Sequence, residues 1–405
     1  MSELPVITVD RPSHRYWVGE EAVFSITSLE SRKIDVKFLT DDRQILFGQQ
    51  LSLQAGIVSH LKFGLQAPGF LRCRVTVLSD NGDEETAQCV VAFEPEQIPI
   101  RMPEREDFQV FWENAVSELH KIPADFKLTP DPSMAIHDFD FYRVSAANVN
   151  DSRIYGYLSI PKKMYEPVPL IVTLSGYGPG FNAASMWARR EYLGVWRESV
   201  CTLCLNMHEF EPANGPADLK RQYDEFCAEN NNYHYYMSGM KDPASSYLLR
   251  GILGCLRLTE CVATLPCINP KRIVWAGSGQ GGDFGLYLCH LSDLFSAAMI
   301  GVPGFCNLDG VSPVFGGLPE FQKYTEEQRL FDGVHHAARI KIPILMLVGY
   351  TNESNYPSLA YPVLRALKGE RVVLDLTGES SADNGTSHLR LVRTWLRDRL
   401  GLYTK

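Results

Sequence analysis

The sequence lacks the features that would place a chain in a membrane or on nucleic acid. It has no apolar run of about 18 residues or more, so we expect no transmembrane helix. Its start, Met1–Pro5, has no basic segment followed by an apolar one, which predicts no signal peptide and a cytoplasmic protein, although a leader removed beforehand would leave the same start. The formal net charge of −9 and the absence of a basic stripe interleaved with aromatics lead us to expect neither nucleic acid nor a membrane as a partner.

Cysteine is present, but its placement points to packing. The ten cysteines are scattered through apolar segments, which is typical of buried free thiols in a reducing compartment. Cys201 and Cys204 have the spacing of a Cys-x-x-Cys motif, yet they fall in a strand-like run. Residues i and i+3 of a strand face opposite sides, so this pair is poorly placed to hold one metal. We therefore expect both side chains in the core.

The first part of the chain reads as a β-domain. Short alternating runs are separated by turn signals, for example Ala22–Ile26, Ile34–Leu39 and Leu71–Val77. Strands at regular spacing with period-two patterning predict an antiparallel sandwich of immunoglobulin-like type over residues 1–95. No residue in it has a catalytic pattern, so we expect a packing or positioning role.

A second domain follows a proline-punctuated linker at residues 96–105 and occupies residues 106–405. It opens with helical spacing from Asp107 to Leu119, and near-continuous hydrophobic strands then alternate with helical segments. Such strands are buried on both faces, so this pattern predicts a doubly wound, mostly parallel α/β sheet. The predicted strands are Leu170–Leu174, Val200–Leu205, Arg272–Ala276, Pro343–Val348 and Arg371–Leu376.

One strand leads into a nucleophile elbow. The strand Ile273–Ala276 is followed by Gly277–Gly282, reading Gly-Ser-Gly-Gln-Gly-Gly, and then by the apolar helix Phe284–Leu288. In Gly-x-Ser-x-Gly elbows the nucleophile stands at the tip of a sharp strand-to-helix turn. The glycine spacing puts position 279 at that tip, and it is glycine. Ser278 stands one residue early, which would turn its hydroxyl away from the site.

Around this elbow the chain resembles the acetyl xylan esterase and cephalosporin C deacetylase family. The similarity covers roughly residues 104–400 and rests on several motifs in order. They are the Asp-Phe-x-x-Phe-Trp opening at Asp107–Trp112, the tyrosine-glycine loop at Gly176–Gly180, the segment Asp242–Gly251 and the elbow Gly277–Gly282. The resemblance implies an α/β-hydrolase fold with a serine, a carboxylate and a histidine at the site.

The differences from that family lie at its catalytic positions. Gly279 replaces the serine, Asn352 stands where the family has its acid, and only His388 occupies a suitable place. Asn206–Phe210 replaces the family's Arg-Gly-Gln segment. Acyl transfer needs a nucleophile, a histidine and a carboxylate, and an aspartate-to-asparagine change costs a serine protease about 10⁴ in turnover. We therefore expect ordinary ester hydrolysis to be lost.

The binding half of the site is expected to persist. Backbone N–H groups of Gln280 and of Tyr177 or its neighbour would form the oxyanion hole, and these do not depend on the missing side chain. An elbow tip usually holds a positive φ, which glycine adopts without strain. Gly279 fits natural drift or deliberate inactivation, and Asn352 favours drift.

Other residues were considered for acid–base work. His208 and Glu209 follow a strand end, where α/β sites form, so they could be a repurposed pair or a solvated loop. Glu353 is a second candidate to orient His388. His335 and His336 are expected at the surface or at a helix end rather than as ligands. His208–Glu209 lacks the second histidine of a zinc motif, so we expect no metal and no cofactor.

Three hypotheses about function follow. In the first, an esterase-like protein binds a small ester or carboxylate, an acetylated carbohydrate for example, at Tyr177, Gln280, Ser278 and His388. In the second, a lyase, isomerase or cyclase uses His388 or the pair His208 and Glu209 as general acid or base. In the third, the chain is a non-catalytic binding or assembly protein. The resemblance also implies a homo-oligomer.

Overall fold

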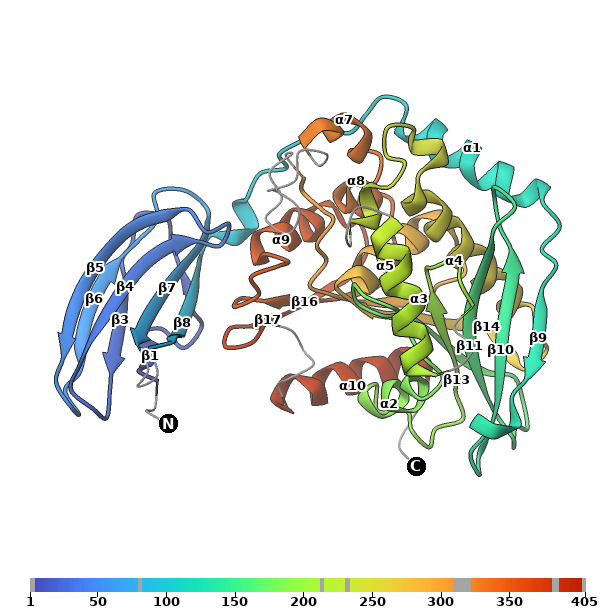
Figure 1. Ribbon diagram of the computed structural model, residues 1–405, viewed down its shortest axis with the longest axis horizontal. Coiled ribbons are helices and arrows are strands. Elements are labelled where there is room, and N and C mark those ends of the chain that lie inside the picture. Colours follow the sequence, from blue (N-terminus) through green and yellow to red (C-terminus); the bar gives the residue numbers. More distant parts are fainter. Residues whose placement is uncertain are drawn as a thin grey trace.

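The computed structural model describes residues 4–78, 82–211, 215–229, 234–308, 322–380 and 386–402, with the side chains of residues 386 and 387 excepted. Within these ranges the chain forms strands up to Phe93 and then alternates strands with helices (Figure 1). Figure 1 shows the N-terminal strands at one side of the molecule and the larger α/β part at the other.

The N-terminal part, called the β-domain below (residues 4–93), holds two sheets. One sheet has the order β1-β3-β6 and the other the order β2-β8-β7-β4-β5. Alternate side chains of β3 and β4 are buried, and Phe24 and Phe38 meet edge to face at 5.3 Å in the shared core. The three predicted strand runs lie within β3, β4 and β7, while the immunoglobulin-like type and the boundary at residue 95 stay predictions. The strands are β1 (Val6–Val9), β2 (Arg15–Tyr16), β3 (Ala22–Thr27), β4 (Arg32–Thr40), β5 (Ile45–Leu53), β6 (Ser59–Phe63), β7 (Gly69–Leu78) and β8 (Glu84–Phe93).

The larger part is built on a nine-stranded sheet of order β17-β16-β15-β14-β12-β13-β11-β10-β9. Neighbours from β13 through β12 to β17 run parallel, whereas β9, β10 and β11 are antiparallel, as is the β11–β13 pair. All five predicted hydrophobic strands are present. The strands are β9 (Lys127–Pro130), β10 (Phe139–Ala147), β11 (Arg153–Pro161), β12 (Val168–Leu174), β13 (Cys201–Asn206), β14 (Ile268–Ser278), β15 (Ala297–Gly301), β16 (Ile344–Gly349) and β17 (Arg371–Leu376).

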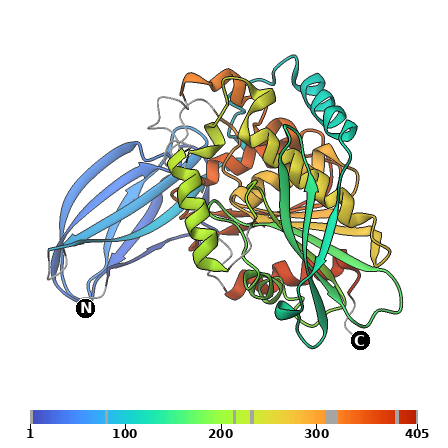
Figure 2. The same ribbon diagram turned by 45° about the vertical axis from the view of Figure 1, so that its right-hand side comes forward.

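Helices cover both faces of this sheet, which is why its strands are apolar on both sides (Figure 2). Val274 and Ala276 of β14 pack in the core shared with α10, while Trp275 between them packs with α4 and α5. The two cores confirm the predicted doubly wound sheet. The helices are α1 (Phe108–Lys121), α2 (Ser185–Tyr192), α3 (Pro216–Glu229), α4 (Tyr247–Ala263), α5 (Gln280–Leu291), α7 (Thr325–Gln328), α8 (Gly333–Ala337), α9 (Pro357–Ala366) and α10 (Thr386–Leu400).

The β-domain packs against β16, β17 and α9. Phe70 of β7 meets the ring of Tyr350 edge to face at 5.0 Å and lies 5.8 Å from that of Tyr361. Arg15 of β2 forms an ion pair of 2.7 Å with Asp375 of β17. Phe70 belongs to the same buried cluster as the α/β core, so the two parts share apolar packing.

Two expectations about single residues are settled by burial. Cys201 and Cys204 are both buried and fall in different apolar clusters, which confirms that they face opposite sides of β13. His335 and His336 lie in α8 as expected of helix-end residues, but both are buried, so the surface placement is wrong. The aromatic ring of Phe108 packs on both imidazoles. Among the described helices, none combines the length and apolarity needed to cross a bilayer.

Candidate functional site

The elbow is formed as the sequence spacing predicts. Strand β14 ends at Ser278, helix α5 begins at Gln280, and Gly279 between them has φ 58° and ψ −125°. An L-residue is strained at this positive φ, and glycine is not. A Cβ built at Gly279 would meet only Asn355 Nδ2 at 3.7 Å and Gly176 Cα at 3.9 Å within 4 Å, among the described residues outside its own turn. Position 279 is therefore a tip at positive φ with room for a side chain but without one.

The flanking glycines have no such room. A Cβ at Gly277 would lie 2.4 Å from the carbonyl oxygen of Gly281, and one at Gly281 would lie 2.5 Å from that of Leu174. Ser278 Oγ lies 2.3 Å from the position that a Cβ on Gly301 would take, so this hydroxyl is directed toward β15. The Ser278 side chain therefore faces the neighbouring strand β15 and not the elbow tip.

The start of α5 supplies a hydrogen-bond donor beside the tip. Gln280 is the first residue of α5, where backbone N–H groups have no partner inside the helix. Its side-chain Oε1 accepts a hydrogen bond of 2.7 Å from the Tyr235 hydroxyl. The ring of Tyr235 stacks on Tyr177 at 4.4 Å, and Gly176, next to Tyr177, lies beside the tip. Burial raises the pKa of Tyr235 well above its ordinary value, so its hydroxyl donates as a neutral group.

Asn352 closes a turn. Its Oδ1 accepts the backbone N–H groups of Ser354 at 2.9 Å and Asn355 at 2.7 Å, and its Nδ2 donates to the carbonyl of Ser380 at 2.8 Å. Both the oxygen and the nitrogen of this amide thus bind surrounding backbone groups. Within the described residues, the hydrogen bonds found for this amide go to the backbone of Ser354, Asn355 and Ser380.

His388 faces a different acidic residue. Its Nδ1 lies 3.4 Å from Oε1 of Glu379, which follows β17. The sequence reasoning missed Glu379, although an acidic residue shortly after the last strand and nine positions before the histidine was a usable signal. Because the carboxylate can orient the imidazole, this pair supplies what Asn352 does not.

Glu353, the other residue considered for orienting His388, faces the β-domain. Its Oε1 lies 2.6 Å from Arg74 Nη2 and 3.6 Å from Arg72 Nη1, and its Oε2 lies 3.7 Å from Arg43. Three arginines of the β-domain therefore converge on this one carboxylate.

His208 is buried in an aromatic cluster. Its Nε2 lies 3.0 Å from the carbonyl oxygen of Gly178, which can only accept, so Nε2 carries the hydrogen and Nδ1 accepts from the Tyr247 hydroxyl at 2.9 Å. Burial lowers the pKa of His208 to about 4. Neither ring nitrogen is left for substrate chemistry, and the neutral imidazole supports the Gly176–Gly180 loop.

Glu209 is also held in a structural contact. Its Oε1 lies 2.7 Å from Nε of Arg250 on α4, and Arg250 Nη1 donates to the carbonyl of Ser245. The adjacent pair His208 and Glu209 is thus divided between two different sets of partners. In the part of the chain that the structure describes, no group of three or more His, Cys, Asp or Glu side chains could hold a metal ion.

Among the described residues outside the elbow turn, Asn355 has the side chain closest to the Cβ position at Gly279, and the sequence did not predict it. Its Nδ2 donates to the carbonyl of Val302 at 2.7 Å, just beyond the end of β15. Val302 has a positive φ of 36°, which is rare for a β-branched residue. Such strained residues often lie at functional sites, and Val302 directly follows β15 near the elbow. No local motif marks Asn355, since its neighbours Val302 and Gly279 are far away in sequence.

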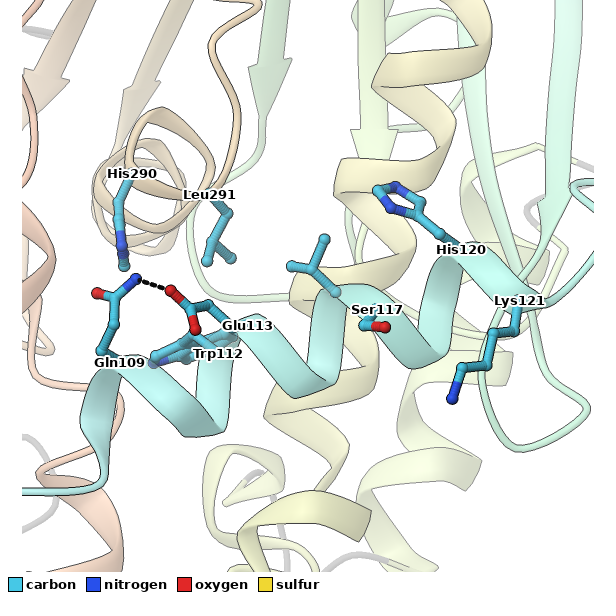
Figure 3. Close-up of a pocket in the computed structure, with 9 residues that line it drawn as sticks. Gln109, Trp112, Glu113, Ser117, His120, Lys121, His290 and Leu291 are labelled. Carbon is cyan, nitrogen blue, oxygen red and sulfur yellow. Dashed lines mark hydrogen bonds between the residues drawn. The ribbon is translucent and has the colours of Figure 1, made fainter.

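A large surface groove lies away from this site. It has a volume of about 630 Å³ and lies between α1 and the end of α5, where Gln109 and Glu113 are joined by a hydrogen bond of 2.7 Å (Figure 3). His290, which lines it, is ten residues after Gln280 on α5, so at 1.5 Å per residue it is roughly 15 Å from the elbow. The groove therefore does not serve the elbow.

Known proteins share this architecture. An acetyl xylan esterase from Paenibacillus sp. R4 superposes with a TM-score of 0.61 at 19% identity, over 75% of this chain and 98% of the other. Acetyl Xylan Esterase 1 from Thermoanaerobacterium sp. JW/SL YS485 gives a TM-score of 0.57 at 16% identity, over 75% and 95%. At these identities the likeness shows the fold, which is that of α/β-hydrolase esterases.

Sequence similarity carries the family assignment. The acetyl esterase Axe7A of Xylanibacter ruminicola is 25% identical over 308 residues, which cover 74% of this chain and 67% of that protein. The sequence profile of the acetyl xylan esterase (AXE1) family extends over residues 97–396. Since that profile spans most of the chain and includes the whole elbow region, this protein belongs to the acetyl xylan esterase (AXE1) family.

Proposed function

We propose that this protein binds a small ester or carboxylate at the elbow, with an acetylated carbohydrate as the favoured class, and that it has lost ordinary serine-esterase activity. The observation that carries the proposal is the tip of the elbow. Gly279 keeps the positive φ of a nucleophile position and has space for a side chain, but it offers no oxygen or sulfur to attack a carbonyl.

Retention of the donors supports binding. The first N–H of α5 points from a helix N-terminus, where partial positive charge favours a carbonyl or carboxylate oxygen. The hydrogen bond from Tyr235 to Gln280 fixes the side chain of the residue that carries this N–H. A preorganised donor binds an oxygen whether or not a nucleophile stands beside it.

The ligand class comes from the relatives. The similar proteins carry the names acetyl esterase and acetyl xylan esterase. A binding pocket inherited with this fold would therefore accept acetyl groups on a sugar, and the exposed ring of Tyr177 beside the tip is suited to stacking on one.

A hydrolysis assay tests the loss of activity. Using 4-nitrophenyl acetate and acetylated xylo-oligosaccharides, we expect the protein to release no more product than its His388→Ala variant. Hydrolysis that disappears in His388→Ala would show another nucleophile at work and would overturn this part of the proposal. Calorimetric titration with the same oligosaccharides tests binding, and no heat at millimolar ligand would overturn the binding part.

The variant Gly279→Ser separates a missing nucleophile from a wider change. Since a Cβ fits at the tip and His388 has a carboxylate partner in Glu379, we expect hydrolysis above that of the parent protein. Removal of that gain by Glu379→Gln would place the carboxylate in the restored site. A silent Gly279→Ser would mean that Asn352 and the segment 206–210 also block hydrolysis.

A further inference from the structure

The ligand site has a side-chain donor, Asn355, and the β-domain holds it in place. We propose that Asn355 is a ligand-binding residue, and that Arg72 of the β-domain is the positioning residue that holds Asn355 beside Gly279. The inference rests on the proposed function, and it adds both the group that recognises the ligand and the task of the N-terminal β-domain.

The amide of Asn355 has one hydrogen to spare. Its Nδ2 carries two hydrogens, one of which goes to the carbonyl of Val302, and Nδ2 lies 3.7 Å from the Cβ position at Gly279. Within the described residues no second hydrogen bond from this nitrogen is found. The spare N–H therefore lies where an oxygen placed over Gly279 would meet it.

The direction of this amide is fixed by its surroundings. The carbonyl of Val302 can only accept, so the nitrogen of Asn355 must face it. Val302 is held in its strained conformation by the hydrogen bond from its own N–H to the carbonyl of Leu347 at 2.9 Å. A Cβ at Gly304 would lie 2.5 Å from Asn355 Oδ1, so a larger residue at 304 would displace the amide.

A short turn connects Asn355 to the β-domain. The backbone N–H of Asn355 is bound by Oδ1 of Asn352, which fixes the turn from the 352 side. The carbonyl of Asn352 then accepts from Arg72 Nη2 at 3.2 Å, and that of Thr351 accepts from Arg72 Nη1 at 3.4 Å. Arg72 thus donates hydrogen bonds to two successive carbonyls at the base of the turn that contains Asn355.

Arg72 is an unusual residue to find in such a place. It lies on β7 and its side chain is only 1% exposed. A buried guanidinium is costly unless its N–H groups are satisfied, and its planar fork suits two neighbouring oxygens. The partner Gln88 on β8 accepts from Nη1 of Arg72 and donates to the carbonyl of Thr351 at 3.5 Å. The β-domain therefore places a buried guanidinium against the loop that contains Thr351 and Asn352.

The donors at the tip favour an anionic oxygen. They are the backbone N–H at the start of α5 and the amide of Asn355, and no carboxylate lies within 4 Å of the Cβ position at Gly279 among the described residues. Hydrogen bonds to a charged oxygen are stronger than those to a neutral one. Acetate, the carboxylate of the acetyl group, is therefore a suitable ligand with which to probe these donors.

Hydrogen exchange tests the role of Arg72 without any ligand. Arg72→Lys keeps a buried cation but loses the fork, and Arg72→Gln loses both. In the full chain we expect the amides of residues 351–355 to exchange about tenfold faster or more in both variants, because two hydrogen bonds at the base of the turn are lost. Arg11→Gln is the control, since Arg11 pairs with Glu20 inside the β-domain. Unchanged exchange at 351–355 would overturn the positioning role.

Acetate binding tests Asn355 and its coupling to Arg72. We expect Asn355→Ala to weaken the Kd for sodium acetate about tenfold or more, as for loss of a hydrogen bond to a charged group. Arg72→Lys should weaken it as well, but should add nothing in the Asn355→Ala background, while its effect on unfolding stays the same in both backgrounds. An arginine with only a structural role would not affect acetate binding in one background and leave it unchanged in the other.

The outcomes separate this inference from the proposed function. If the parent protein binds acetate and Asn355→Ala binds equally well, Asn355 is not a ligand-binding residue, and the proposed function stands. If the two substitutions weaken binding independently, Arg72 does not act through Asn355. If the parent protein binds neither acetate nor an acetylated sugar, the proposed function and the ligand role of Asn355 fall together, and hydrogen exchange alone decides the role of Arg72.

Discussion

Asn352 Oδ1 accepts the backbone N–H of Asn355 at 2.7 Å. Asn352, at the position where the resemblance expects the acid, thus organises a turn that places Asn355 beside the elbow. A carboxylate for His388 comes instead from Glu379, which follows the end of β17. The glycine at the elbow tip and the turn built on Asn352 are therefore two features of one site.

Asn352→Asp should destabilise the protein without improving catalysis. An aspartate could still accept the N–H groups of Ser354 and Asn355, but it could not donate to the carbonyl of Ser380 and would set two oxygens against each other. We expect a loss of about 1–3 kcal/mol in the free energy of unfolding, measured by urea denaturation at pH 7. Equal or greater stability in Asn352→Asp would mean that the bond to Ser380 is unimportant.

Gly279→Ala and Gly277→Ala should differ sharply. At Gly279 an added Cβ meets nothing closer than 3.7 Å, so the cost is that of an L-residue at positive φ, about 1–2 kcal/mol. At Gly277 the Cβ would lie 2.4 Å from a backbone oxygen, so we expect a larger loss or no folded protein. Thermal and urea unfolding of the two variants measure the difference, and equal losses would contradict this account of the elbow.

Acid should destabilise the fold through buried histidines. Burial lowers the pKa of His208 from 6.5 to about 4, so between these values the unfolded state takes up a proton and the folded state does not. Stability is then complete above pH 6.5 and falls as pH decreases toward 4, by about 3 kcal/mol for this group. Unfolding free energies at pH 7, 5.5 and 4.5 should show a shallower slope in His208→Gln. His137→Gln is the control, because that side chain is 98% exposed. An unchanged slope in His208→Gln would exclude this histidine as a source.

Ionisation of Asp283 should give the free energy of unfolding the opposite dependence on pH. Burial raises its pKa to about 7, although the N–H groups of Gly304 and Phe305 oppose this rise. The folded state keeps the proton that the unfolded state loses above about pH 4, so the penalty grows as pH rises to 7 and stays constant beyond it. Asp283→Asn keeps an acceptor for both N–H groups and cannot ionise. Relative to the parent protein it should gain about 2–3 kcal/mol between pH 5 and pH 8. A constant difference across that range would mean that Asp283 does not titrate there.

The sequence determined what depends on local pattern. Hydrophobic runs set β12, β13, β14, β16 and β17, and glycine spacing set the elbow, because both reflect the needs of neighbouring residues. The resemblance to esterases was readable for the same reason, since motifs such as Gly277–Gly282 are short and contiguous. The sequence thus identified Gly279 as a tip without a nucleophile.

Tertiary structure alone decided which side chains serve that tip. Asn355 lies beside it while hydrogen-bonded to Val302, and Arg72 reaches the same loop across 280 residues of sequence. His208 looked available for acid–base work until its burial and both its hydrogen bonds were known. Such partnerships depend on where strand ends and β7 come together in space, and residue type and spacing do not encode that placement locally.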